Sequence, residues 1–206
     1  MRIITVSREF GSGGRELGKR MADILGCAYY DKEIITAIAK DSHMDEKYIE
    51  RLLSTSDFLA YPITIASTFS YPTFIQNHEV DLLLSRQRVI KHIATQGDCI
   101  IMGQGADSIL SGCQPLNLFV YADMQAKLNR CKERAPKDEN LTDQQLQNKI
   151  LQVDEGRARQ YEFISAKEWG EKGNYHLCIN TTEMNIKDLA PLIAEYAELW
   201  FEVKKS

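Results

Sequence analysis

The sequence lacks several features that mark special classes of protein. Its five cysteines are scattered and form no C-x-x-C pair, which argues against a disulfide framework or a metal site and indicates reduced thiols. No apolar run approaches the roughly 18–20 residues of a membrane span, and the N-terminus is strand-like rather than a signal peptide. We therefore expect a cytoplasmic protein with no membrane partner.

Positive charge is also in short supply. The formal net charge of −4 does not suit duplex nucleic acid, which needs many phosphate-neutralising cations. A small anionic ligand needs only a few local arginines and remains compatible with this charge. The four histidines show no metal-ligand or catalytic-triad spacing, so no metal ligand is assigned.

What the sequence does contain is typical of one globular α/β domain. With 206 residues, 44% of them hydrophobic and 26% charged, it is long enough to bury a sizeable core. Strand-like and helix-like patterns alternate, which indicates a doubly wound parallel sheet. The predicted strands are Ile3–Val6, Cys27–Tyr30, 98–103, Leu116–Tyr121 and His176–Ile179. The predicted helices are Arg15–Leu25, Lys32–Lys40, Asp45–Ser54, Glu79–Thr95, 123–134, Thr142–Ser165 and Ile186–Val203.

The first strand leads into a glycine-rich loop followed by a helix. Such a loop lets backbone N–H groups close around phosphate oxygens at the positive end of the helix dipole. The usual signature G-x-x-x-x-G-K-S/T is not met, because Gly14 stands at the lysine position and Arg15 at the hydroxyl position. We expect Arg15, with Arg8 as a second cation, to supply the missing charge. The alternative is a tight turn that needs its glycines only for positive φ.

Other polar residues follow the ends of later predicted strands. Asp31 comes after the second strand, and Gln104 and Asp107 come after the third. Because ligands of doubly wound folds sit beyond the carboxyl ends of the strands, we expect these residues to gather at one edge of the sheet.

The string ITVSREFGSGGRELGKRMADILG, followed by YYDKEII, resembles the cytidylate kinase-like family, a divergent branch of P-loop nucleoside monophosphate kinases. IIMGQGADSIL, RCKER, VDEGRARQY and NYHLCINT follow in the family's order and extend the resemblance over most of the chain. The resemblance implies a P-loop NTPase-type, five-stranded parallel sheet flanked by helices. Within one domain of residues 1–206 it implies an insert that binds the nucleoside monophosphate, at about 31–77, and a mobile lid at about 135–160.

The resemblance also implies a reaction and roles for particular residues. The reaction is ATP-dependent phosphoryl transfer to a nucleoside monophosphate, CMP or dCMP, with Mg²⁺ as a second cofactor. The residues implied to bind ATP are Gly11, Ser12, Gly13, Gly14, Arg15 and Glu16. The implied catalytic arginines, which neutralise the moving phosphoryl group, are Arg15, Arg130, Arg134 and Arg157. The residues implied to bind the acceptor are Asp31, Lys32, Gln104, Asp107 and Arg159.

Each of these roles has a plainer alternative. The arginines also suit a solvated helix face, and Arg157 lies three residues after Asp154 as in a helix salt bridge. Glu16 is either a magnesium ligand or a surface glutamate of a first helical turn. Asp107 either replaces the aspartate that better-known cytidylate kinases carry at the position of Met102, or caps a helix.

Two further alternatives concern function. Gln104 stands where the family commonly has an arginine that faces the acceptor's phosphate, so a kinase of another small acceptor is one alternative. A non-catalytic nucleotide-binding or regulatory protein is the other, since the usual lysine, hydroxyl and strand-end carboxylate are all absent. The aromatic segment 58–74 predicts base stacking, a hydrophobic flap or a contact in a homodimer.

Overall fold

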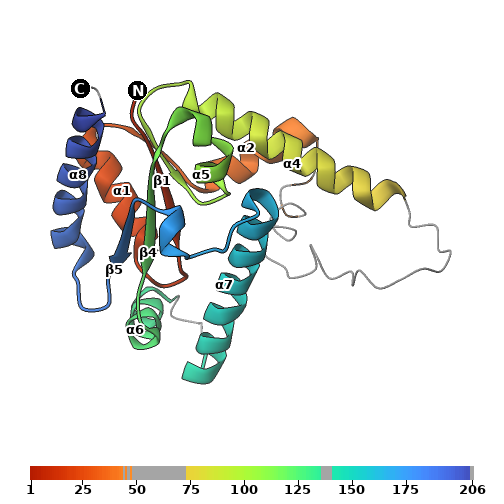
Figure 1. Cartoon of the computed structure of the whole chain (residues 1–206). Coiled ribbons are helices and arrows are strands. Elements are labelled where there is room, and N and C mark those ends of the chain that lie inside the picture. Colours follow the sequence, from red (N-terminus) through yellow and green to blue (C-terminus); the bar gives the residue numbers. More distant parts are fainter. Residues whose placement is uncertain (44, 46, 48–72, 136–140, 205–206) are drawn as a thin grey trace.

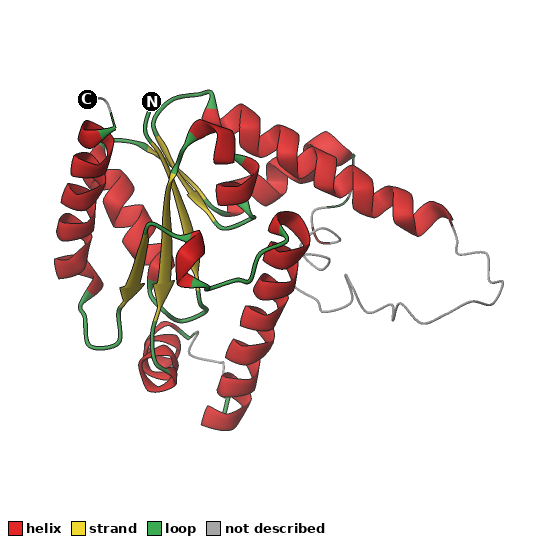
Figure 2. Ribbon diagram, viewed as in Figure 1, coloured by secondary structure: helices red, strands yellow, loops and turns green. Residues whose placement is uncertain are grey.

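The computed structural model describes residues 1–43, 45, 47, 73–135 and 141–204. In this part of the chain, helices cover both faces of a sheet of five parallel strands (Figures 1 and 2). In chain order the elements are β1 (Ile3–Arg8), α1 (Gly14–Leu25), β2 (Ala28–Tyr30), α2 (Lys32–Ser42), α4 (Thr73–Ala94), β3 (Cys99–Met102), α5 (Ala106–Ile109), η2 (Ser111–Cys113), β4 (Leu116–Tyr121), α6 (Met124–Arg134), α7 (Asp143–Ser165), η3 (Lys172–Asn174), β5 (Leu177–Asn180) and α8 (Ile186–Val203).

The strands are apolar on both sides because both sides are covered. In β1, Ile4 and Val6 pack into one core cluster with residues of α1 and α8. Ile3 packs into a second cluster with residues of α2 and α4 on the opposite face. This two-sided burial explains why the strands read as continuous apolar runs rather than as alternating patterns. It confirms the α/β, parallel-sheet fold predicted from the sequence.

The order of the strands places the glycine-rich loop at a crevice. The sheet runs β2-β3-β1-β4-β5, with β1 paired to β3 on one side and to β4 on the other. The chain leaves β1 towards β2 and leaves β4 towards β5, so the connections diverge between β1 and β4. Ligands of doubly wound sheets bind at such a switch point, beyond the carboxyl ends of the strands.

The predicted elements match the observed ones closely, except for α4. This helix begins at Thr73 rather than at Glu79, because the aromatic and β-branched residues before Glu79 are weak helix formers and gave no sequence signal. The predicted helix Asp45–Ser54, the aromatic residues up to 72 and the loop 136–140 lie outside the described residues, as do parts of the predicted insert and lid. No helix in the described part of the chain is long and apolar enough to cross a membrane.

Candidate functional site

The loop between β1 and α1 has a backbone that requires glycine. Gly11 and Gly13 have φ angles of 77° and 83°, in the left-handed region that other residues rarely adopt. A Cβ atom on Gly14 would lie 2.6 Å from Cβ of Arg8. Within the described part of the chain, the N–H groups of Gly13, Arg15 and Glu16 have no protein acceptor. The loop therefore presents several free amides at the N-terminus of α1, as an anion site requires.

Contacts from within the chain hold this loop in shape. The Ser12 hydroxyl donates to the carbonyl oxygen of Glu9 at 2.8 Å, and the Thr181 hydroxyl donates to the Ser12 carbonyl at 2.6 Å. The Phe10 N–H donates to Oδ1 of Asp154 on α7 at 2.6 Å. Ser12, predicted among the ATP-binding residues, thus uses its buried hydroxyl to brace the loop.

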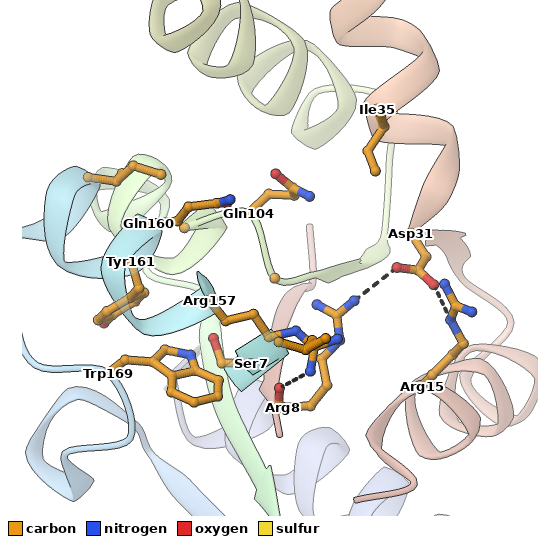
Figure 3. Close-up of a pocket in the computed structure, with 14 residues that line it drawn as sticks. Ser7, Arg8, Arg15, Asp31, Ile35, Gln104, Arg157, Gln160, Tyr161 and Trp169 are labelled. Atoms are coloured by element: carbon orange, nitrogen blue, oxygen red, sulfur yellow. Dashed lines mark hydrogen bonds and ion pairs between the residues drawn. The ribbon is translucent and has the colours of Figure 1, made fainter. Parts of the chain in front are cut away.

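Two cavities open on either side of the loop. The first, here called the loop cavity, has a volume of about 440 Å³ and is lined by the loop together with residues of α6 and α7. The second, here called the inner cavity, has a volume of about 380 Å³ and lies over the ends of β1 and β3 (Figure 3). Arg8, Arg15 and Arg157 line both cavities. The junction between the cavities is therefore built from three guanidinium groups.

A single carboxylate ties two of these arginines together. Nη2 of Arg8 donates to Oδ1 of Asp31 at 3.1 Å, and Nε of Arg15 donates to Oδ2 of Asp31 at 2.5 Å. Nη1 of Arg157 donates to the carbonyl oxygen of Arg8 at 2.9 Å (Figure 3). Asp31 and Arg15, predicted for acceptor and donor binding respectively, are thus brought into direct contact.

The junction carries an excess of positive charge, and two of its guanidinium groups are largely buried from solvent. Burial lowers the pKa of Arg8, which the charge of Asp31 partly offsets. Burial, followed by the nearby charge of Arg8, lowers the pKa of Arg157 to about 10. Both guanidinium groups remain cationic at neutral pH. Crowding cations in low-dielectric surroundings is unfavourable unless an anion joins them, so the junction is suited to phosphate groups.

A second ion-pair cluster fixes α7 to the loop. Nζ of Lys127, on α6, lies 2.6 Å from Oε2 of Glu9 and 3.4 Å from Oδ2 of Asp154. Asp154 also pairs with Arg157 at 3.4 Å, so the helix salt bridge considered for Arg157 is present alongside its place at the cavities. Asp154 thereby connects the loop, α6 and α7.

Replacing Asp154 with alanine is expected to reduce the free energy of unfolding by about 3 kcal/mol, because it leaves buried Lys127 without one of its carboxylates. Denaturant unfolding would measure the loss. Asp143→Ala is the matched control on the same helix, since Asp143 forms only an exposed pair with Lys132 and should change stability by less than about 1 kcal/mol. Equal effects of the two substitutions would contradict the bracing role of Asp154.

Aromatic residues form one wall of the inner cavity. Trp169 packs edge-on against Phe119, with ring centroids 5.2 Å apart, and Tyr161 donates to Oδ2 of Asp107 at 2.8 Å. Asp107 is buried behind this wall and does not line the cavity, and burial raises the pKa of its carboxyl group. The described residues thus provide, in Trp169, an aromatic face that lines the cavity, whereas the sequence analysis considered base stacking only as one alternative for segment 58–74.

The remaining predicted residues lie at different distances from the junction. Arg130 and Arg134 line the loop cavity; Arg130 donates to the carbonyl oxygens of Thr181 and Met184, and Arg134 pairs with Glu16. Glu16 also pairs with Arg20 at 2.8 Å, so its carboxylate is already engaged.

Two more predicted residues have no described part in the cavities. Arg159 lines neither of them and lies 3.8 Å from Glu155 on its own helix. Lys32 begins α2, but its side chain is not among those described. Gln104 does line the inner cavity, with a φ of 62°, and its amide points away from Arg8 and Arg157 (Figure 3).

Sequence reasoning missed Lys127, Glu9 and the contact between Asp154 and the loop. Lys127 is 6% exposed, although it lies in a helix whose composition is strongly polar. Its spacing in α6 resembles that of any surface lysine, so no local signal marked it. In the described part of the chain, no three His, Cys, Asp or Glu side chains come together as a metal site.

Comparison with known proteins supports this description of the fold. Residues 3–183 match the family model described as the cytidylate kinase-like family, which confirms the resemblance seen in the sequence. A crystal structure of an uncharacterized protein from Eubacterium ventriosum shares 22% identity, with a TM-score of 0.70 over 96% of this chain and 99% of that chain. Shikimate kinase from Bacteroides thetaiotaomicron shares 17% identity, with a TM-score of 0.56 over 96% and 98% of the two chains.

TT1252 from Thermus thermophilus shares 16% identity, with a TM-score of 0.56 over 96% of this chain and 97% of that chain. At these identities the likeness concerns the fold alone. No curated protein matches the chain.

Proposed function

Because the chain belongs to the cytidylate kinase-like family, we propose that it transfers the γ-phosphoryl group of ATP to a nucleoside monophosphate, with CMP or dCMP as the acceptor. Family membership supports nucleotide-dependent phosphoryl transfer in general, and ATP and Mg²⁺ as the reagents such proteins use. The choice of acceptor is the finer part of the proposal. The observation that supports the proposed reaction most strongly is that the two cavities meet at Arg8, Arg15 and Arg157.

This junction suits the demands of phosphoryl transfer. Catalysis of that reaction consists mostly of holding donor and acceptor in line and neutralising charge on the moving group. A donor in the loop cavity and an acceptor in the inner cavity would meet beside the three guanidinium groups. Arg157 is held by the Arg8 carbonyl and by Asp154, so its position is set before any ligand arrives.

The residues of the loop cavity fit a nucleotide triphosphate. The free amides of Gly13, Arg15 and Glu16 would bind phosphate oxygens. A Cβ atom added at Gly13 or Gly14 would collide with Ile186 or Arg8, so these two glycines let the loop keep the shape that presents the amides. Arg130 and Arg134, on the far wall, would add charge to the same phosphates.

Mg²⁺ keeps several waters and is held largely by substrate phosphates in kinase sites. The described carboxylates that contact or flank the loop, those of Glu9, Glu16 and Asp154, are all paired with cations. We therefore propose that the metal enters bound to the nucleotide and would neutralise charge on its phosphate groups.

The residues of the inner cavity fit the acceptor. Arg8 and Arg157 would face the acceptor's phosphate, and Trp169 offers an aromatic face to a base or sugar. Asp31 holds Arg8 and Arg15 in place and would release Arg15 when phosphate oxygens compete for it.

Coupled ADP release from MgATP, with CMP, dCMP, UMP and AMP as separate acceptors, tests the proposal. We expect turnover that depends on CMP or dCMP and is at least tenfold slower with UMP or AMP. Turnover with none of the four acceptors would contradict it.

A nucleotide-binding protein without turnover is the second candidate, favoured by Gly14 and Arg15 in place of the usual lysine and hydroxyl. Calorimetry with ATP and CMP separates the two, since binding without ADP release would support this candidate alone.

Gly103 provides a test that changes the position of Arg8 without substituting any arginine. Its φ is +66°, and a Cβ atom there would overlap Nη1 of Arg8, so Gly103→Ala must push the guanidinium aside. We expect turnover to fall roughly tenfold to a hundredfold, because small misplacements of a positioning group are costly. Gly112→Ala is the control, since a Cβ at Gly112 meets nothing within 4 Å. Unchanged turnover in Gly103→Ala would mean that Arg8 does not act at the site.

A further inference from the structure

A buried hydrogen bond joins α7 to the short helix α5. The Tyr161 hydroxyl donates to Oδ2 of Asp107 at 2.8 Å, and the two residues are 4% and 7% exposed. Burial raises the pKa of the Asp107 carboxyl group, and hydrogen bonds from Tyr161 and from the backbone at 107–108 oppose that rise. Burial and the neighbouring carboxylate raise the pKa of the Tyr161 hydroxyl, which therefore stays protonated as the donor. The proposed reaction gives this bond no role.

Asp107 follows a turn with a strained backbone. Gly103, Gln104 and Gly105 have φ angles of 66°, 62° and 66°, so three successive residues lie in the left-handed region. Glutamine adopts this conformation only at an energetic cost, and such strain persists where the surroundings enforce it. A Cβ atom on Gly105 would lie 3.0 Å from side-chain atoms of Ile164, so the turn packs directly against α7. The bond from Asp107 to α7 anchors the turn at its C-terminal end.

The same turn touches the arginine junction. A Cβ atom on Gly103 would overlap Nη1 of Arg8, so this guanidinium lies directly against the turn. Arg157 lies four residues before Tyr161, on the same face of α7, and its Nη1 donates to the carbonyl oxygen of Arg8 at 2.9 Å (Figure 3). The turn, the two arginines and α7 thus form a closed ring of contacts around one side of the inner cavity. The bond between Tyr161 and Asp107 completes that ring.

We propose that Asp107 and Tyr161 are positioning residues, whose hydrogen bond fixes the guanidinium groups of Arg8 and Arg157 relative to each other. Asp31 fixes Arg8 to the N-terminus of α2, whereas the Asp107–Tyr161 bond relates Arg8 to α7, the helix that carries Arg157. Asp107 lines neither cavity, and the Tyr161 hydroxyl is directed to Asp107, so both residues act through the arginines. The kinetic part of this inference rests on the proposed function.

Tyr161→Phe removes one hydroxyl and keeps the ring. We expect kcat with CMP to fall about tenfold, because small misplacements of charged groups at a reacting centre are costly. The KM for ATP should stay within about twofold, since the loss falls on the transition state. Tyr196→Phe is the matched control, because Tyr196 packs in the core beside α1 and lines neither cavity.

A bond that only stabilises the fold predicts another result. Tyr161→Phe would then unfold at a lower temperature while its kcat, measured well below that temperature, stayed at the wild-type value. A kcat within about twofold of the wild-type value, whatever the change in thermal stability, would overturn the inference.

Variants of Asp107 test the same bond from its other end. Asn keeps a hydrogen bond with the Tyr161 hydroxyl in either orientation of its amide, so Asp107→Asn should keep kcat within about threefold of the wild-type value. Asp107→Ala should reproduce the loss in Tyr161→Phe, and the double variant should be no slower than the slower single one, because both changes break one bond. If Tyr161→Phe does not fold, the comparison of Asn with Ala decides the question. Equal losses in Asp107→Asn and Asp107→Ala would contradict a role for the bond.

Nuclear magnetic resonance of protein labelled with nitrogen-15 provides a readout that needs no turnover. The Nε–H signals of Arg8 and Arg157 report how firmly each guanidinium is held. We expect Tyr161→Phe to shift both signals and to speed exchange of these protons with water about fivefold or more, because local opening becomes easier. The signal of Arg2, whose Nε donates to Asp98 at 2.6 Å, should not change. Unchanged signals of Arg8 and Arg157 would overturn the inference.

The two readouts separate this inference from the proposed function. If wild-type protein releases no ADP with any acceptor, but the Arg8 and Arg157 signals move in Tyr161→Phe, only the proposed function fails. If wild-type protein phosphorylates CMP, and Tyr161→Phe keeps both the wild-type kcat and the wild-type signals, only this inference fails.

Discussion

Replacing Arg157 with methionine is expected to lower kcat about a thousandfold. Arg157 lines both cavities at their junction, so under the proposed function its charge would act on the phosphoryl group during transfer rather than on either nucleotide at rest. Arginines that act on the transition state of phosphoryl transfer contribute on the order of 10³-fold or more to kcat. An effect confined to the transition state lowers kcat and leaves the KM for ATP and CMP nearly unchanged.

Lys172→Met is the control for the loss of one positive charge, because Lys172 is exposed in η3 and lines neither cavity. Thermal unfolding of Arg157→Met, compared with Asp154→Ala, separates catalysis from bracing of α7. A kcat within tenfold of the wild-type value would show that Arg157 does not stabilise the transition state.

Replacing Arg15 with alanine is expected to weaken ATP binding about a hundredfold. Arg15 lies in the first turn of α1, beside the free amides of the loop. In the sequence it directly follows Gly14, which occupies the position of the usual signature's lysine. A hydrogen bond to a charged group contributes about 1.5–3 kcal/mol, which corresponds to a tenfold to hundredfold change in affinity. Calorimetry with ATP in the presence and absence of Mg²⁺ measures the loss directly.

Lys19→Ala is the matched control on the same helix, because Lys19 is exposed and pairs with Asp23 at 3.0 Å. If Arg15 serves only to balance Asp31, Arg15→Ala would leave ATP affinity at the wild-type value. That result would assign phosphate binding to the loop amides and to Arg130 and Arg134.

The fold could be predicted from the sequence because its signals are local. The β-branched run Ile3–Val6, the glycines after it and the amphipathic pattern of Arg15–Leu25 together specify a strand, a tight glycine-rich loop and a helix. The observed β1 and α1 differ from those ranges by two residues at most. The gathering of Asp31 and Gln104 at one cavity followed from the rule that parallel strands end at one edge.

The parts of the site that the sequence missed depend on contacts between distant residues. The Phe10 N–H meets Asp154 across 144 positions of the chain, and only the packing of α7 against α6 brings them together. Arg86 was likewise unremarkable in a long amphipathic helix, although it is only 3% exposed and lines a small hollow with Gln160 and Phe163 of α7. Patterns along the chain can indicate which face of a helix is buried, but not which buried charge finds a partner.

Transfer of the labelled phosphoryl group is the most direct measurement. The protein would be incubated with CMP and with ATP that carries radioactive phosphorus at its γ-position, and the products separated by chromatography. If the two cavities hold donor and acceptor on either side of Arg8, Arg15 and Arg157, the label will appear in CDP at the rate at which ADP forms. Label found only in inorganic phosphate, or retained in ATP, would contradict phosphoryl transfer across this junction.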